Sequence, residues 1–311
     1  MATLPSMTRE RRARRVWRPF AVRLADELAA LLDDVDVLLD GSKIVNIDPN
    51  DRWSDSDAVF IGFPLWGWKP DGDEQTQRRL DLLKRWEQWR QLFGLLFPDP
   101  PPDVKTRIGE GTKLINAWLK RPGGDHSVPS TIAAAKVSLR EGTKGLGELL
   151  TMAAAADPGV VAIPDTNALI DAPDVATYGS VLGTDRFDVR LIAPVTAELD
   201  RLKREGRTPE LREKVQSVIR RIKGFRDRGN LVDGVQLTHD VRFFSQAREP
   251  DFSRMPEWLD RDNADDRILA CALELQGSHA AATVVLVTSD LNLQTKADAA
   301  GLPYVEPPHS I

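Results

Sequence analysis

The sequence predicts an α/β fold, with a parallel sheet in the C-terminal half and a mainly α-helical region before it. After residue 158, short apolar runs rich in β-branched residues alternate with segments of helical periodicity, which is typical of a parallel sheet covered by helices on both faces. Before residue 157, helical periodicity prevails. The turn-forming run Asp157-Pro158-Gly159 separates the two patterns, so we expect one domain over residues 1–157 and another over 158–311.

Composition excludes several classes of protein. The 311 residues, 41% of them hydrophobic, suffice for about two domains with hydrophobic cores. The net charge of -5 taken over the whole chain gives no sign of a nucleic-acid partner. The single cysteine, Cys271, rules out an intrachain disulfide and a cysteine-based zinc site. No apolar run reaches the ~18 residues that span a bilayer, so we expect a cytoplasmic protein without membrane contact.

The N-terminal region is predicted to hold four helical segments, together with a Trp-rich stretch at Ile61–Trp68 for which strand and irregular structure both stay open. The helical segments are Ala21–Leu39, one around Leu82–Leu96, Val104–Lys120 and Ser130–Ala156. The apolar residues of the second segment form a seam along one side of the helix: Leu82, Trp86, Trp89, Phe93 and Leu96. We expect its own domain to bury this seam, with a protein partner or self-association as the alternative.

An arginine-rich arm precedes these helices. It sets six arginines against Glu10 within the first 20 residues, namely Arg9, Arg11, Arg12, Arg14, Arg15 and Arg18. Such an arm is either a solvated tail or a segment that binds phosphate groups.

The C-terminal region is predicted to hold three strong strands and two weaker ones. The strong strands are Val160–Pro164, Val189–Val195 and Thr283–Thr288, and the weaker ones are Leu231–Leu237 and Tyr304–Val305. The predicted helices are Pro194–Glu205, Pro209–Arg228, Ala264–Gln276 and Leu291–Ala300. Residues Asp240–Asp262 are predicted to be a loop.

Carboxylates follow each strong strand. Asp165 ends the first, Glu198 lies on the helix after the second, and Asp290 follows the third, while Asp265 and Asp266 begin the helix that precedes the third strand. Each acid taken alone is better explained as a helix cap or a first-turn acid than as a ligand. Together at the carboxyl edge of a sheet, where ligands bind, they would repel one another unless a cation lay between them.

An all-oxygen ligand set without histidine or cysteine suits Mg²⁺ or Mn²⁺. Such an ion can polarise phosphoryl oxygens, activate a bound water and steady the leaving oxygen. The carboxylates therefore point to phosphodiester hydrolysis.

Four segments carry a family resemblance: P-D-T-N-A-L-I-D, P-V-T-A-E-L-D, N-A-D-D-R-I-L-A-C-A-L-E-L and L-V-T-S-D-L-N-L-Q-T-K-A. In this order, over about residues 158–307, they resemble the PIN domain, the metal-dependent ribonuclease fold that includes the PhoH-associated nucleases. The resemblance implies a Rossmann-like α/β sandwich with a Mg²⁺ or Mn²⁺ site that cleaves single-stranded RNA internally. Nothing before residue 157 resembles the family, and the phosphate-binding motif of the PhoH-type ATPase is absent.

The resemblance also assigns residues. By motif position the catalytic acids and metal ligands would be Asp165, Glu198, Asp265 and Asp290, with Asp266 competing with Asp265 as a metal ligand. Asn167 and Ser289 resemble accessory polar positions.

A basic stretch follows Glu198. Residues 201–228 hold 11 lysines and arginines against 4 acids, an excess of 11 minus 4, or 7 positive charges. Candidate contacts to RNA phosphates are Arg201, Lys203, Arg204, Arg220, Arg221 and Lys223, with Arg267 and Lys296 as further candidates that could equally pair with neighbouring acids. The competing interpretation is an exposed, salt-bridged pair of helices. Phe225, Phe243 and Phe244 are the nearby aromatic residues, and burial is the commoner fate of phenylalanine.

The sequence is compatible with three functions. The leading hypothesis is a metal-dependent endoribonuclease whose helical region regulates it, binds a partner or grips substrate. The alternative is a catalytically silent PIN-like module that binds RNA or protein. An aspartyl phosphatase is disfavoured, because its mechanism requires a second aspartate two residues after the nucleophile, and here that position is Asn167.

Overall fold

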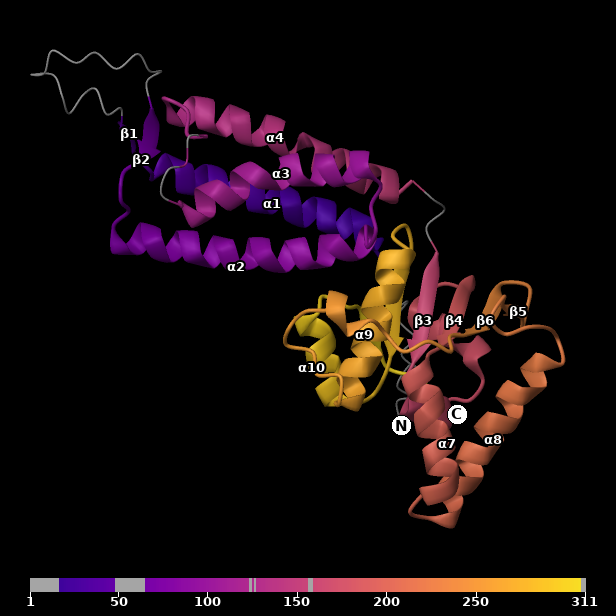
Figure 1. The fold of residues 1–311 in the computed structure, drawn as a ribbon. Coiled ribbons are helices and arrows are strands. Elements are labelled where there is room, and N and C mark those ends of the chain that lie inside the picture. Colours follow the sequence, from indigo (N-terminus) through magenta and orange to yellow (C-terminus); the bar gives the residue numbers. More distant parts are fainter. Residues whose placement is uncertain (1–16, 48–64, 123–124, 126, 156–158, 309–311) are drawn as a thin grey trace, which may run out of the picture. The chain divides into compact units, whose positions relative to one another are not determined.

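The computed structural model describes residues 17–47, 65–122, 125, 127–155 and 159–308. Most of the arginine-rich arm, the first residues of the Trp-rich stretch and the Asp157-Pro158 turn fall outside them. The chain divides into two compact units (Figure 1). One is Ala21–Ala155, and the other combines Ala156–Ile311 with Met1–Phe20.

In its described residues, the first unit is a bundle of four helices with a short antiparallel hairpin. Its elements are α1 (Phe20–Asp40), β1 (Ile44–Asn46), β2 (Trp66–Trp68), α2 (Asp73–Leu96), α3 (Pro102–Lys120) and α4 (Ile132–Ala153). The hairpin pairs Ile44 with Trp68. Pro102 opens α3, where its missing amide hydrogen costs no helical bond, and Thr131 caps α4.

The aromatic seam of α2 lies in the core of this unit. Trp86, Trp89 and Phe93 are each no more than 2% exposed, and their rings stack in sequence with centroids 5.1 Å and 4.8 Å apart. The Trp89 indole donates to the Leu24 carbonyl oxygen on α1. Leu95 is buried and Leu96 is half-buried. The seam is thus used inside its own unit, and a partner protein would have to contact another face.

The second unit is built on a six-stranded sheet in the described residues, with strand order β5-β6-β4-β3-β7-β8. The strands are β3 (Val160–Pro164), β4 (Phe187–Leu191), β5 (Val235–Gln236), β6 (Val241–Ser245), β7 (Thr283–Val287) and β8 (Tyr304–Val305). Every neighbouring pair is parallel except β5 and β6. The central strand β3 lies between β4 and β7, so the carboxyl ends of three parallel strands meet at one edge.

The strand expected at Val189–Val195 lies earlier in the chain. The observed strand β4 ends at Leu191, and a helix begins at Ala193 because Pro194, which has no amide hydrogen for a sheet ladder, suits a first helical turn.

The expected loop Asp240–Asp262 contains a strand that the sequence did not predict. Strand β6 pairs in parallel with β4, with Phe187 opposite Val241, and the weak strand expected at Leu231–Leu237 reduces to β5 on its outer side. The run V-R-F-F-S lacks clean alternation, so burial beside β4 rather than local pattern makes it a strand.

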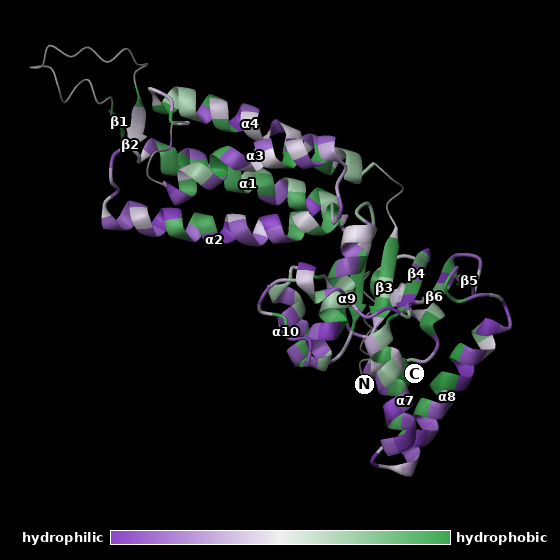
Figure 2. Ribbon diagram, viewed as in Figure 1, coloured by the Kyte–Doolittle hydropathy of each residue, from purple (hydrophilic) through white to green (hydrophobic). Residues whose placement is uncertain are grey.

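Helices connect the strands. They are α5 (Thr166–Asp171), the short helices η2 (Val175–Tyr178) and α6 (Gly179–Leu182), α7 (Ala193–Glu205), α8 (Pro209–Arg226), η3 (Phe252–Arg254), α9 (Ala264–Ser278) and α10 (Leu291–Ala299). All five residues of β7 are buried, as expected for a parallel strand covered on both faces. Figure 2 shows β3 as hydrophobic and the far ends of the α7–α8 pair as hydrophilic.

The segment before α1 belongs to this second unit. The Trp17 indole donates to the Leu182 carbonyl oxygen over 2.6 Å, and the Phe20 amide donates to Ala282 over 3.2 Å. Phe20 is 2% exposed. Leu182 and Ala282 both lie shortly before a strand begins, so these contacts are at the amino edge of the sheet, opposite the carboxylates described next.

In the part of the chain that the structure describes, none of the helices combines the length and the apolar character that crossing a bilayer requires.

Candidate active site

Asp165 is held at the carboxyl end of the central strand by three hydrogen bonds. Its amide donates to the Val287 carbonyl oxygen over 3.1 Å, which extends the β3–β7 ladder by one residue. Its Oδ1 accepts from the Ala168 amide over 2.6 Å and thereby caps α5, and the Thr288 hydroxyl donates to its carboxylate. The side chain is almost fully buried, at 4% exposure of the residue.

Asp290 occupies the equivalent place after the neighbouring strand. Its Oδ1 accepts from the amides of Asn292 and Leu293 and caps α10, and its own amide donates to the Thr288 hydroxyl over 3.0 Å. Thr288 is fully buried. Because its hydroxyl bonds both Asp165 and the backbone of Asp290, Thr288 ties the two strand ends together.

Glu198 reaches the same edge from α7. Its Oε2 accepts from the Thr166 hydroxyl over 2.7 Å, one residue beyond Asp165. Burial raises the pKa of Asp165, and the negative charges of Asp290 and Glu198 raise it further against the two hydrogen bonds that lower it. Three carboxylates from three segments of the chain therefore interact electrostatically at one place.

Asp265 joins this edge through α10. Its Oδ2 accepts from the Asn292 side chain over 2.6 Å, two residues beyond Asp290. The amides of Asp265 and Asp266 both donate to the Asn263 side chain, which caps α9. Asp265 thus lies beside the first turn of the helix that Asp290 begins.

Asp266 points into a different environment. Its Oδ1 accepts from the Lys296 ammonium over 2.6 Å, its Oδ2 accepts from the Asp260 amide over 3.0 Å, and its side chain is 7% exposed. Both oxygens are used in holding the start of α9 against α10 and the preceding loop. Asp265 is more exposed than Asp266 and lies 3.8 Å from the same ammonium, so its oxygens have fewer close partners and it is the better candidate of the two for a ligand.

Among the described residues, no group of three or more His, Cys, Asp or Glu side chains is arranged to hold a metal ion. The chemistry of the four acids still suits a hard divalent cation, because every donor is a carboxylate oxygen. Two of them also have a cation nearby, since Arg201 lies 3.4 Å from Glu198 and Lys296 lies 3.8 Å from Asp265. Strand ends and helix caps fix the backbone of Asp165 and Asp290. For several of these acids to bind one ion, their side chains would therefore have to rotate while the backbone stays in place.

Residues 162–306 match the family model of the PIN domain. The C-terminal unit contains a PIN domain. The mostly parallel sheet with its connecting helices agrees with this match, which indicates a nuclease-type fold for the unit. No family model matches the N-terminal half, and no curated protein matches the chain.

The accessory positions expected in the PIN domain are exposed. Asn167 lies on the outer side of α5. Ser289 lines a cavity of about 550 Å³ together with Asp171, Lys214 and Glu306, so this cavity opens beside the carboxyl edge of the sheet and brings a lysine from α8 close to it.

The basic residues expected to contact RNA fall into two groups. Six of them are exposed along α7 and α8, namely Arg201, Lys203, Arg204, Arg220, Arg221 and Lys223. Arg267 and Lys296 are less exposed and are in close ion pairs of 2.6 Å, Arg267 with Glu249 and Lys296 with Asp266, whereas the ion pairs in the first group are longer. The first group therefore offers positive charge to a ligand, while the second group stabilises the PIN domain.

The aromatic residues noted in the sequence are buried, and a different aromatic residue is exposed. Phe225, Phe243 and Phe244 are each less than 10% exposed and belong to the core. Trp258, in the loop before α9, is 48% exposed. The buried Leu259 follows it, and Asp260 then bonds Asp266, so Trp258 is anchored close to the start of α9. Sequence reasoning missed this residue, although a tryptophan between Pro256 and Asp262 in a polar loop was a usable signal.

Proposed function

We propose that the PIN domain is a metal-dependent endoribonuclease that hydrolyses phosphodiester bonds of single-stranded RNA with Mg²⁺ or Mn²⁺. The observation that carries this proposal is the buried Asp165, whose pKa is raised by burial and by the charges of Asp290 and Glu198. A buried carboxylate among like charges is unfavourable without a cation, and this one lies at the edge where α/β sheets bind ligands.

The chain's own residues have distinct roles in this proposal. Asp165, Glu198, Asp265 and Asp290 would hold the ion, which when bound supplies charge stabilisation and an activated water. Thr288, Thr166 and Asn292 orient these carboxylates through the hydrogen bonds described above. The exposed basic residues of α7 and α8 would bind the phosphates on either side of the scissile bond.

The test is cleavage of an unstructured RNA by the purified chain in Mg²⁺ or Mn²⁺. Asp165→Asn and Glu198→Gln should each lower the rate by more than about 100-fold, beyond the 10–100-fold typical of residues that only orient a ligand. Asp200→Asn is the matched control, because Asp200 is exposed on the same helix two residues after Glu198 and should leave the rate unchanged. If Asp165→Asn cleaves as fast as the wild type, the assigned site is wrong.

One observation favours a second candidate, a PIN-like module that binds RNA or protein without cutting. It is that no three acids among the described residues are arranged to hold a metal ion. Wild-type chain that binds RNA but leaves it intact in both Mg²⁺ and Mn²⁺ would select this candidate.

A further inference from the structure

Lys296, on α10, lies close to two neighbouring acids at the start of α9. Its ammonium donates to Asp266 Oδ1 over 2.6 Å and lies 3.8 Å from Asp265 Oδ2. It also donates over 3.1 Å to the side chain of Asn263, the residue that caps α9. The Lys296 side chain is 22% exposed. The ammonium is therefore held against α9 and does not extend into solvent.

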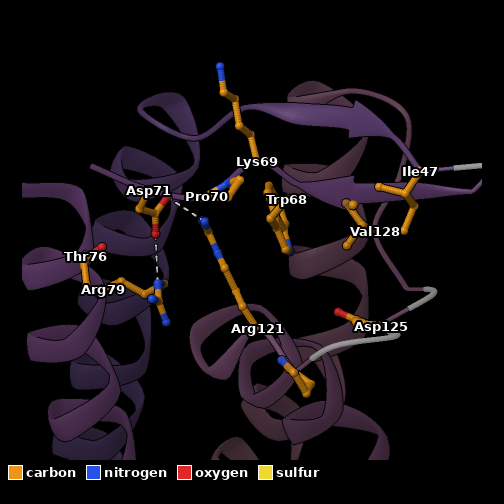
Figure 3. A pocket seen from close by; sticks show the side chains of 12 residues that line it. Ile47, Trp68, Lys69, Pro70, Asp71, Thr76, Arg79, Arg121, Asp125 and Val128 are labelled. Carbon is orange, nitrogen blue, oxygen red and sulfur yellow. Dashed lines mark hydrogen bonds and ion pairs between the residues drawn. The ribbon is translucent and has the colours of Figure 1, made fainter. Parts of the chain in front are cut away.

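The two acids share this single cation. The ion pairs around Asp71 in the helical unit show the opposite arrangement, in which one carboxylate accepts from the guanidinium groups of Arg79 and Arg121 (Figure 3). At the start of α9, two carboxylates and one ammonium leave a charge of 2 minus 1, or one negative charge, within the group of three. Because the ammonium reduces the repulsion between the two acids, it already does part of what a metal ion does among crowded carboxylates.

The oxygens of the two acids differ in how many partners they have. Both oxygens of Asp266 are bonded, Oδ1 to Lys296 and Oδ2 to the Asp260 amide. Asp265 Oδ2 accepts from the Asn292 side chain over 2.6 Å, whereas Asp265 Oδ1 has no hydrogen-bond partner among the described residues. Asp265 thus has one oxygen for a metal ion, and Asp266 has none.

Asp290 uses its oxygens in the same way as Asp265. Its Oδ1 caps α10 by accepting from two amides, and its Oδ2 makes no hydrogen bond or ion pair in the described part of the chain. Mg²⁺ is usually bound through one or two carboxylates, with water and substrate phosphates in its other positions. Asp265 and Asp290 each offer one oxygen of this kind, which suffices for a single ion.

A second ion would meet Lys296. Two-metal nucleases hold their ions about 3.5–4 Å apart, so neighbouring carboxylates contact both ions. A second ion beside Asp265 would need an oxygen of Asp266, and Lys296 occupies the one that faces Asp265. The ammonium would also repel the ion, because like charges a few ångströms apart interact strongly in a partly buried site.

We infer, on the basis of the proposed metal-dependent function, that Lys296 takes the place of a second metal ion and that the carboxylates bind one divalent ion per chain. Lys296 is a positioning residue in this site. Its ammonium neutralises Asp266 and leaves Asp265 Oδ1 to the ion.

The first experiment counts the Mn²⁺ ions that the full chain binds without RNA, by isothermal titration calorimetry and by electron paramagnetic resonance. We expect one ion per chain and no spin coupling between bound ions. Two coupled ions would overturn the role of Lys296 while leaving the proposed metal-dependent function intact. A chain that binds no Mn²⁺ would contradict both.

The second experiment repeats this count on variants. Lys296→Ala removes the ammonium and frees Asp266, so we expect it to bind two ions per chain. The double variant Lys296→Ala, Asp266→Asn lacks the second acid and should bind one ion again. Lys296→Arg keeps the positive charge and should also bind one. If Lys296 has only a structural role, the number of ions is the same in all these variants and in the wild type.

Far-ultraviolet circular dichroism establishes that each variant is folded. If folded Lys296→Ala binds a single ion, or if the double variant binds two, Lys296 does not occupy a metal position and the inference is overturned. The count on the wild type tests it even if Lys296→Ala does not fold.

Discussion

At the scale of single residues, Asp165 caps α5 and, on the proposed function, also binds the metal ion, and these two roles require different properties of the side chain. Capping α5 needs a short side chain with an oxygen acceptor, which asparagine supplies as well as aspartate does. The negative charge is not needed for the cap, and its burial beside Asp290 and Glu198 is unfavourable. Burial of this carboxylate beside two others, which the cap does not require, is the physical basis for the proposed role of Asp165 in metal binding.

This conflict predicts a stability change. A carboxyl whose pKa is raised in the folded state destabilises that state once it ionises, so its contribution is lost as the pH rises through the folded pKa. Asp165→Asn should therefore raise the unfolding temperature of the PIN domain by a few degrees at pH 7 in EDTA. The difference from the wild type should shrink in Mg²⁺, because only the wild type gains from ligation.

Scanning calorimetry at several pH values checks this expectation. The gain from Asp165→Asn should diminish toward acid pH, where the wild-type carboxyl is protonated. A variant that is less stable than the wild type in EDTA across the whole range would show that the charge of Asp165 helps to hold the fold.

Trp258 is a second residue whose placement predicts function. Its exposed ring lies near the start of α9, and stacking of a base on an aromatic ring contributes about 1–3 kcal/mol. On the proposed function, Trp258→Ala should weaken binding of single-stranded RNA about 10-fold in EDTA, whereas Trp258→Phe should retain most of the affinity. Fluorescence anisotropy with a labelled RNA measures this. The control is Val232→Ala, at another exposed apolar residue, and equal affinities of Trp258→Ala and this control would refute the role.

At the scale of elements, the α7–α8 pair combines a buried side with a strongly basic exposed side. Leu199, Val215 and Val218 are buried, and Thr208 caps α8 directly after the turn. The ion pairs recorded along the exposed side, Arg201 with Glu198 over 3.4 Å and Arg221 with Asp174 over 3.9 Å, are solvent-exposed and weak. Most of the excess charge is therefore available to a polyanion.

Replacing Arg220 and Arg221 by alanine tests whether this surface binds RNA. Each phosphate contact contributes about 0.7 to the slope of log K against log salt for a single strand, so loss of two contacts should lower the slope by about 1.4. Titrations at several salt concentrations supply the slope. The double variant Arg78→Ala, Arg85→Ala on α2 is the control, and a slope that changes equally in both would indicate only general charge effects.

At the scale of the whole molecule, the helical unit is an insertion into the PIN-containing unit. Among the described residues, those from Trp17 to Phe20 group with the unit that follows the helical one in the chain, so that unit is formed from both sides of the helical unit. Trp17 and Phe20 contact the amino edge of the sheet. These contacts are therefore at the opposite edge from Asp165 and Asp290. Each unit has its own core and its own cavity.

Local patterns in the sequence were enough to determine much of this protein. Helical periodicity, turn residues and β-branched runs predicted most helices and the strands β3, β7 and β8, and the motifs around Asp165, Glu198, Asp265 and Asp290 predicted the PIN domain that the family match shows. These features depend on residues close together in the chain, where spacing alone carries the information.

Only the tertiary structure decided the rest. Burial beside β4 makes Val241–Ser245 a strand, Lys296 and Asp260 bond the oxygens of Asp266 while Asn292 bonds Asp265, and Asp71 and Ser42 hold the Arg121 side chain. Each outcome depends on partners distant in sequence. Local spacing cannot encode it, because the free energy that selects it comes from contacts that exist only once the chain has folded.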